Sequence, residues 1–197
     1  MRGASAIGFL LWCGGVVLGW LMLTNYATRP TAAAETAAEW PAEVTLERDP
    51  GKATLIIAAH PLCPCTQATV GELAELMALY GESVTTYVLF FEPMDSAEGW
   101  AKADLWQRAR AIPGVRTIID RGGRLRDRFG ARSSGQTFLY DAQGKLVFAG
   151  GVTPSRGHSG DSVGRSAIEG FLATGKISSP TAPVFGCSLV DPSEVSE

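Results

Sequence analysis

The stretch AAHPLCPCTQATVGEL, residues 58–73, places Cys63 and Cys65 on either side of a single proline, three residues after His60. It follows the run TLIIAA at 54–59, and a short continuous apolar run is typical of a strand buried on both faces. After the cysteines, apolar residues recur at helical spacing as far as Gly81. The stretch therefore predicts a buried strand, a tight turn that carries both cysteines, and a helix that Thr66 can cap.

Alternating strands and helices are expected along the rest of the domain. The expected strands are 84–91, 115–119, 137–140 and 145–149, the last two joined by a hairpin turn at 141–144. Asp95 and Glu98 form a capping box that predicts a helix through Ala109, a short helix is expected near 125–129, and Asp161 or Ser162 opens a last helix. Strands separated by helices, with a hairpin at one edge, indicate an α/β fold with a mixed sheet.

The N-terminal segment has no charged residue from position 3 to 28, and residues 4–23 are almost wholly apolar. Twenty such residues in a helix rise about 30 Å, enough to cross a hydrocarbon core. The charges around the segment favour the N-terminus inside and the bulk of the chain outside. A cleaved signal peptide is the alternative, because residues 32–34 offer an A-x-A cleavage site. Either reading puts the domain outside the cytoplasm, where disulfide chemistry is permitted.

Composition sets further limits on the 197-residue chain. The net charge is −3 and no block of Lys or Arg stands out, which argues against a nucleic-acid partner. Four cysteines are too few for a disulfide scaffold, and their spacing matches no four-ligand zinc pattern. The predicted organisation is a transmembrane anchor or signal peptide at 1–24, a linker at 25–42, a domain at 43–175 and a tail at 176–197.

The strand, the Cys-Pro-Cys turn and the helix together resemble the active-site unit of the thioredoxin superfamily. The stretch DRGGRLRDRFGARSSGQTFLYDAQGKLVFAGG, residues 120–151, is similar to the second half of membrane-tethered TlpA/ResA-like (RedB-like) thioredoxins and of peroxiredoxins. The resemblance covers residues 54–175. It implies a thioredoxin-like α/β fold, with a central mixed sheet flanked by helices and preceded by one N-terminal transmembrane helix.

Two departures from that family bear on function. The usual motif is Cys-x-x-Cys, whereas this chain has Cys63-Pro64-Cys65. The cis-proline of the family falls at Gln136, and the threonine that follows it matches as Thr137. In the family that proline shapes the substrate groove and keeps metals off the cysteines. Gln136 therefore leaves room for a metal. Gln136 and Thr137 lie where the family has its substrate groove, so both are candidate substrate-binding residues.

Cys63 is the candidate nucleophile, because the N-terminus of a helix supplies free N–H groups and a positive dipole end that stabilise a thiolate. A disulfide between Cys63 and Cys65 closes a very small ring with a poor dihedral angle. Such strain favours the reduced form, which predicts a labile pair rather than a structural one. A purely structural pair is the alternative.

Other candidate residues lie elsewhere in the chain. His60 is either a base or cation near Cys63 or a packed strand-end residue. Arg156 and His158 lie on a Gly-rich loop, 153–165, that is expected to return toward Cys63 and to bind a thiolate or a substrate anion, unless the loop is only a solvated connection. Cys187 lies in an apolar tail expected to dock on the domain, first as a packed thiol, otherwise as a resolving cysteine or a third metal ligand.

The predicted function is that of an extracytoplasmic, membrane-tethered thiol–disulfide oxidoreductase without a cofactor. Cys63 would attack a disulfide of a partner protein and Cys65 would release it, with His60 assisting the chemistry. Its partners are extracytoplasmic protein thiols or disulfides, and the membrane through the N-terminal helix. One alternative is a copper-binding or copper-delivery protein with Cys63, Cys65 and His158 as ligands, because thiolates and imidazole suit Cu(I). Another is a thiol peroxidase, because Cys-Pro-Cys-Thr loosely resembles the peroxiredoxin Cys-Pro-Thr.

Overall fold

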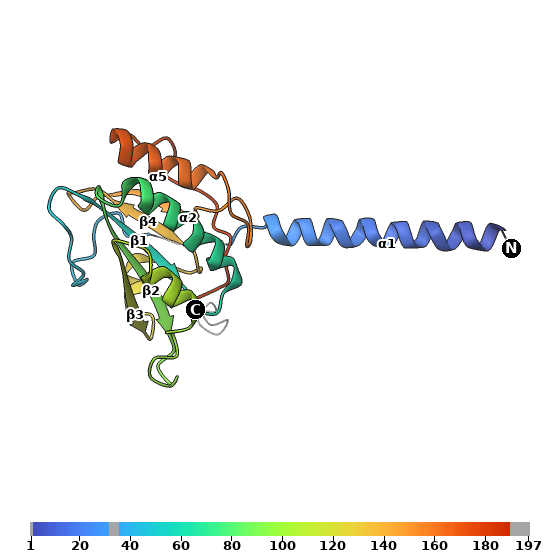
Figure 1. Ribbon diagram of the computed structural model, residues 1–197, viewed down its shortest axis with the longest axis horizontal. Helices are drawn as coiled ribbons and strands as arrows, with labels where there is room; N and C mark the ends of the chain where they lie inside the picture. Colours follow the sequence, from blue (N-terminus) through green and yellow to red (C-terminus); the bar gives the residue numbers. More distant parts are fainter. Residues whose placement is uncertain (1, 32–35, 190–197) are drawn as a thin grey trace.

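A five-stranded mixed sheet forms the centre of the fold in the computed structural model, which describes residues 2–31 and 36–189 (Figure 1). The strand order is β3-β2-β1-β4-β5. Neighbours β1, β2 and β3 run parallel, whereas β4 is antiparallel to both β1 and β5. The strands are β1 (Ala53–Ala59), β2 (Val84–Glu92), β3 (Val115–Arg121), β4 (Thr137–Tyr140) and β5 (Leu146–Gly150). The predicted α/β fold with a mixed sheet and an edge hairpin is therefore confirmed.

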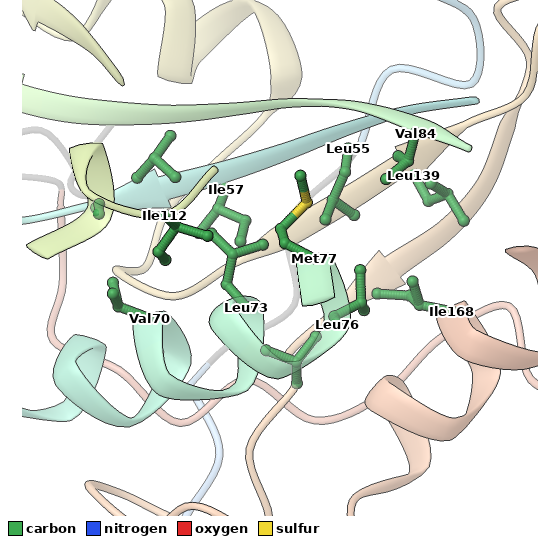
Figure 2. Close-up of a cluster of buried hydrophobic side chains, with 14 of the residues drawn as sticks. Leu55, Ile57, Val70, Leu73, Leu76, Met77, Val84, Ile112, Leu139 and Ile168 are labelled. Carbon is green, nitrogen blue, oxygen red and sulfur yellow. The ribbon is translucent and has the colours of Figure 1, made fainter. Parts of the chain in front are cut away.

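Three helices pack on one face of the sheet and share one hydrophobic core (Figure 2). They are α2 (Pro64–Tyr80), α3 (Asp104–Arg110) and α5 (Val163–Thr174). Leu55 and Ile57 point from β1 to this face and meet Leu73 of α2, and all three are almost fully buried. Because alternate residues of a strand face opposite sides, Ile56 and Ala58 serve a second core. Burial on both faces is what the continuous apolar run of β1 predicts.

The second face is covered by α4 (Arg124–Phe129) and by the segment that precedes β1. The ring of Trp40 lies edge-on to Phe129 and to Tyr140, with centroids 5.3 Å apart in each case. The backbone N–H of Trp40 donates to the carbonyl of Gly144 at 2.7 Å, and the backbone N–H of Leu146 donates to the Ala38 carbonyl at 2.9 Å. The second half of the predicted linker is thus part of the folded domain.

The predicted helix start at Asp95 is wrong, because residues 95–101 form turns and α3 begins only at Asp104, whereas the predicted extent of the helix through Ala109 is confirmed. Hydrogen bonds from residues outside this segment hold it in the turns. A carboxylate oxygen of the buried Glu92 accepts the Ala101 N–H at 3.0 Å, and Arg121 donates to the carbonyl of Ser96 at 3.3 Å. These bonds satisfy backbone groups that a helix would otherwise have to pair.

Two other helix starts test the predicted caps. Ser162 is the N-cap of α5, and its hydroxyl accepts the N–H of Arg165 at 3.1 Å, as the sequence predicts. Thr66 does not cap α2, because the N-cap is Cys63 and Pro64 is the first helical residue. The hydroxyl of Thr66 is turned instead toward Ser134 in a neighbouring loop.

The N-terminal helix α1 (Arg2–Thr28) projects away from the domain (Figure 1). Its segment Ala6–Thr28 has a mean hydropathy of 2.1, so by length and composition it can cross a membrane. The helix runs past residue 24, where the sequence placed the end of the anchor. The proposed cleavage site at 32–34 and the tail beyond residue 189 lie outside the described residues.

Ion pairs around Arg165 fix α5 and the preceding loop to α2. Arg165 contacts Glu72 at 2.5 Å, Glu75 at 2.7 Å and Glu169 at 2.8 Å. Glu72 also accepts the N–H of Gly160 at 2.7 Å, in the loop that leads from β5 to α5. The side chain of Glu72 is only 2% exposed, whereas that of Glu75 is 64% exposed.

Glu72→Gln should destabilise the protein by about 1–3 kcal/mol, because it removes a buried charge from the Arg165 group while keeping the shape of the side chain. The matched change Glu75→Gln should cost less than about 1 kcal/mol, because exposed ion pairs contribute little. Urea unfolding of the full chain in detergent measures both. Equal losses for the two variants would contradict a special role for the buried carboxylate.

Candidate active site

Cys63 lies where β1 ends and α2 begins, with its side chain 3% exposed. Its N–H donates to the carbonyl of His60 at 3.1 Å, and its own carbonyl accepts the Thr66 N–H at 3.2 Å. Its extended backbone (φ −81°, ψ 115°) and the proline that follows make it the N-cap. The first N–H groups of a helix lack partners within it and carry a partial positive charge, so they stabilise an anion at this position.

The loop before β4 holds the end of β1 in place. The Gly135 N–H donates to the Ala58 carbonyl at 2.7 Å, and the Ala58 N–H donates to the Gln136 carbonyl at 2.9 Å. The hydroxyl of Ser134 accepts the His60 N–H at 2.7 Å and is hydrogen-bonded to the hydroxyl of Thr66. The turn that carries Cys63 is thus tied to this loop on both sides of the cysteine.

The C-terminal segment 186–189 lies on that same loop. The Ser134 N–H donates to the Cys187 carbonyl at 2.8 Å, and the Leu189 N–H donates to the Arg132 carbonyl at 2.9 Å. Gly186 passes so close to Ser134 that a Cβ there would lie 1.7 Å from its carbonyl oxygen. The predicted docking of the tail is confirmed for these residues, and the docking brings a third cysteine to the site.

The sulfurs of Cys63, Cys65 and Cys187 all lie within 4.8 Å of one another, and we call them the three-cysteine cluster. The Sγ atoms of Cys63 and Cys187 are in hydrogen-bond contact at 3.0 Å. None of the cysteines of the described chain forms a disulfide. The cluster combines the Cys-Pro-Cys pair with a residue that lies 124 positions away in the sequence.

The three thiols differ in acidity. Burial by itself would raise the pKa of Cys63, but hydrogen bonds from the side chains and N–H groups of Cys187 and Thr66 outweigh burial and lower that pKa to about 7. Burial, the hydrogen bond to Cys63 and the negative charge of Cys63 raise the pKa of Cys187 to about 12. Burial and the charge of Cys63 also raise the pKa of Cys65, with Arg156 opposing them. As the pH rises through neutrality, the first thiolate of the cluster therefore forms on Cys63.

Arg156 brings a positive charge to the cluster. It acts on Cys65 both as a charge and as a hydrogen-bond donor, and it donates to the Gly186 carbonyl at 2.5 Å. The guanidinium of Arg156 lies 5.2 Å from the ring centroid of Tyr26 in α1. The backbone N–H of Arg156 donates to the carbonyl of Ala27, also in α1, at 3.0 Å. The loop after β5 thus returns to the cysteines as the sequence predicts, and it also contacts the end of α1.

The two histidines have different surroundings. His158 is exposed, and its Nδ1 lies 2.7 Å from the Arg156 carbonyl. Among the described residues, Cys187 rather than His158 joins the two other cysteines. Burial lowers the pKa of His60, which keeps its ring neutral; its Nδ1 accepts the Leu62 N–H at 3.2 Å and its ring lies edge-on to Trp100. Its catalytic role stays a prediction.

Gln136 and Thr137 are buried and bonded within their own loop. The side-chain oxygen of Gln136 accepts the Arg132 N–H at 2.9 Å, and the Thr137 hydroxyl donates to the Gly135 carbonyl at 3.2 Å. No peptide bond is cis in the described chain, so the link before Gln136 is trans where the resembled family has a cis-proline. Substrate binding by these two residues stays a prediction.

Sequence reasoning misses Ser134 and gives Thr66 the role of a helix cap, because a single hydroxyl residue carries no pattern that identifies its partner in a distant loop. It ranks Cys187 first as a packed thiol, although a cysteine in the apolar stretch 182–190 of the tail offers a signal.

Comparisons with known proteins address the fold. No protein-family model matches the chain, and no curated protein matches it either. Among solved structures, an uncharacterized conserved protein from Geobacillus kaustophilus is 20% identical, with a TM-score of 0.60 over 84% of this chain and 93% of that one. A hypothetical protein from Sinorhizobium meliloti is 21% identical, with a TM-score of 0.56 over 71% of this chain and 80% of that one.

Further from this chain is an exposed lipoprotein thioredoxin from Streptococcus pneumoniae, 19% identical, with a TM-score of 0.46 over 63% of this chain and 85% of that one. Likeness at these identities concerns the fold alone. The sheet order with β4 antiparallel to β1, and a cysteine at the start of the helix after the first strand, are the arrangement that the resemblance implies. The chain is a thioredoxin-fold protein.

Proposed function

We propose that the protein is a membrane-tethered thiol–disulfide oxidoreductase whose domain lies outside the cytoplasm. The observation that carries the proposal is the position of the Cys63 sulfur at the N-terminus of α2, with two further thiols within 4.8 Å. A thiolate is the attacking species in disulfide exchange, and hydrogen-bond donors around Cys63 favour that form.

The reaction transfers two electrons between this chain and a partner protein. The Cys63 thiolate attacks one sulfur of a partner disulfide, forms a mixed disulfide and releases the other partner sulfur as a thiolate. A second thiol of the cluster then attacks Cys63, its proton passes to one partner sulfur, a proton from solvent goes to the other, and the partner leaves as a dithiol. The sequence assigns this second step to Cys65. The partner disulfide is reduced while a disulfide forms in this chain, and the reverse sequence oxidises a partner dithiol.

The proposed substrates are disulfides or dithiols of extracytoplasmic proteins. Leu62 directly precedes Cys63 and is 61% exposed, so one apolar side chain beside the reactive sulfur can contact a partner chain.

The contacts of α1 support a retained anchor rather than a cleaved signal. The end of the helix is bonded to the site loop through Ala27 and Arg156, and the Thr31 N–H donates to the Val184 carbonyl in the tail at 2.9 Å. Tyr26 lies in the last turn, where aromatic residues commonly occupy the membrane–water interface. Cleavage after residue 34 would remove every one of these contacts.

A second candidate function is the handling of Cu(I) as cargo, favoured by the convergence of three sulfurs. Cys63, Cys65 and Cys187 would hold the ion, because soft thiolates suit Cu(I), with zinc next. This set replaces the predicted ligand set with His158. The raised pKa values of Cys65 and Cys187 oppose it, because both thiols must lose their protons to bind a metal. For that reason we rank this function second.

The alkylation rate of Cys63 should rise with pH and level off above about pH 7–8, because its pKa is lowered to about 7 and the thiolate is fully formed there. Iodoacetamide labelling between pH 5 and 9, with the site located by mass spectrometry, measures the rate. Thr66→Val removes one hydroxyl donor and should move the midpoint to higher pH. A parent rate that still climbs tenfold per unit beyond about pH 8.5 would contradict an activated Cys63.

Cys63→Ser should abolish the reduction of a disulfide-bonded peptide by the dithiothreitol-reduced protein, because serine cannot form the mixed disulfide. Cys13→Ser is the matched control and should keep full activity, because Cys13 lies in α1, outside the cluster. The assay is free-thiol release in detergent. Unchanged activity in Cys63→Ser would rule out the proposed chemistry.

The full chain should remain in the membrane fraction after sodium carbonate extraction, because α1 spans the bilayer and stays attached. N-terminal sequencing of the isolated protein gives a second readout. A soluble product that begins after residue 34 would show that the segment is a cleaved signal.

A further inference from the structure

Cys63 has two possible intramolecular disulfide partners, and the structure favours the distant one. The sulfur contact at 3.0 Å joins Cys63 to Cys187, the cysteine of the tail. We propose that the oxidised protein carries a Cys63–Cys187 disulfide, and that Cys187 rather than Cys65 resolves the mixed disulfide. This inference rests on the proposed oxidoreductase function and names a residue that the Cys-Pro-Cys motif does not contain.

The local pair is poorly placed for a disulfide. Cys63 is the N-cap of α2, with an extended backbone, and Cys65 lies in the first turn of the helix. Their sulfurs lie within 4.8 Å of each other, but a disulfide between residues i and i+2 closes a very small ring. A disulfide requires sulfurs about 2.05 Å apart and a dihedral angle near 90°. Pro64 fixes the backbone between the two cysteines. Closing the Cys63–Cys65 ring would therefore distort the first turn of α2.

Cys187 approaches Cys63 from a separate segment and is free of that ring constraint. Its carbonyl accepts the Ser134 N–H at 2.8 Å, and Arg156 donates to the carbonyl of the preceding Gly186 at 2.5 Å. On the other side, Leu189 is bonded to Arg132 and is buried. Backbone contacts before and after Cys187 thus hold its sulfur against Cys63, the arrangement that an intramolecular attack requires.

The protonation states of Cys63 and Cys187 change from one step of the proposed reaction to the next. While Cys63 is a thiolate, Cys187 stays protonated and donates to it, so the attacking sulfur is stabilised. A mixed disulfide on Cys63 carries no charge, so the repulsion that opposes ionisation of Cys187 is gone. Cys187 then passes its proton to the departing partner thiolate and attacks Cys63 Sγ. The mixed disulfide breaks and the Cys63–Cys187 bond forms. The partner sulfur released in the first step takes its proton from solvent, so the partner departs as a dithiol.

Return to the reduced state needs two electrons from an extracytoplasmic dithiol, which exchanges with the Cys63–Cys187 bond and leaves as a disulfide. Cys65 remains a thiol throughout this cycle, beside Arg156. The new bond joins positions 124 residues apart. Oxidation would therefore fasten the tail covalently to the start of α2.

Disulfide mapping of the diamide-oxidised full chain in detergent tests the inference directly. Trypsin leaves Cys63 and Cys65 together on peptide 53–102 and Cys187 on peptide 177–197, because neither peptide contains an internal Lys or Arg. A Cys63–Cys187 bond joins the two peptides, whereas a Cys63–Cys65 bond leaves peptide 53–102 alone and two hydrogens lighter. We expect the joined peptides, with fragmentation placing the link on Cys63.

Two single variants separate the roles of the second cysteines. Cys65→Ser should keep the joined peptides and the faster migration of the oxidised chain on a non-reducing gel. Cys187→Ser should lose both and accumulate a mixed disulfide with the peptide substrate after a single turnover. Matching circular dichroism of the reduced proteins shows that both variants are folded, and mapping the parent requires no variant at all.

Continuous turnover by Cys187→Ser, with an internal bond in peptide 53–102 of the parent, would overturn the inference and make Cys65 the resolving residue. The proposed function would survive that result. A parent that forms no disulfide and exchanges none would defeat the proposed function as well. A stoichiometric Cu(I) complex together with that inactivity would favour the second candidate function.

Discussion

The site depends on two backbone hydrogen bonds that join the end of β1 to the loop before β4, from Gly135 to Ala58 and from Ala58 to Gln136. They fix the position at which the chain turns into α2, and so the position of Cys63. The same loop then presents the N–H of Ser134 to the carbonyl of Cys187. One short loop thus aligns both segments that supply the sulfurs, although they come from opposite ends of the domain.

The three thiols of the cluster have different pKa values because their charges act on one another. Three thiols packed this closely cannot all ionise, because each negative charge raises the pKa of its neighbours. Cys63 ionises first, because donors from Thr66 and Cys187 surround it. Under the mechanism that we propose, the thiol that stabilises the attacking sulfur by a hydrogen bond is also the group that attacks next.

Local patterns in the sequence predict most of the fold and only half of the site. The apolar run at 54–59 and the Ser162 cap predict β1 and the start of α5, because burial and capping are decided within a few residues. The helix expected from Asp95 fails, because Glu92 and Arg121 satisfy that segment from outside it. The sequence leaves the place of Cys187 open among a packed thiol, a resolving cysteine and a metal ligand, because that place is set by how the tail docks on the loop at 132–134.

Arg156 links the three-cysteine cluster to α1. Its backbone is bonded to α1, its side chain stacks on Tyr26, and its guanidinium reaches Gly186 and influences Cys65. Figure 1 shows α1 leaving the domain on the side where the loop before α5 lies. With α1 in a bilayer, as we propose, the cysteines would lie on the membrane-facing side of the domain, because one arginine side chain spans the gap between them and the helix end. A partner with its disulfide close to the bilayer surface fits that arrangement better than one that must reach over the far side of the domain.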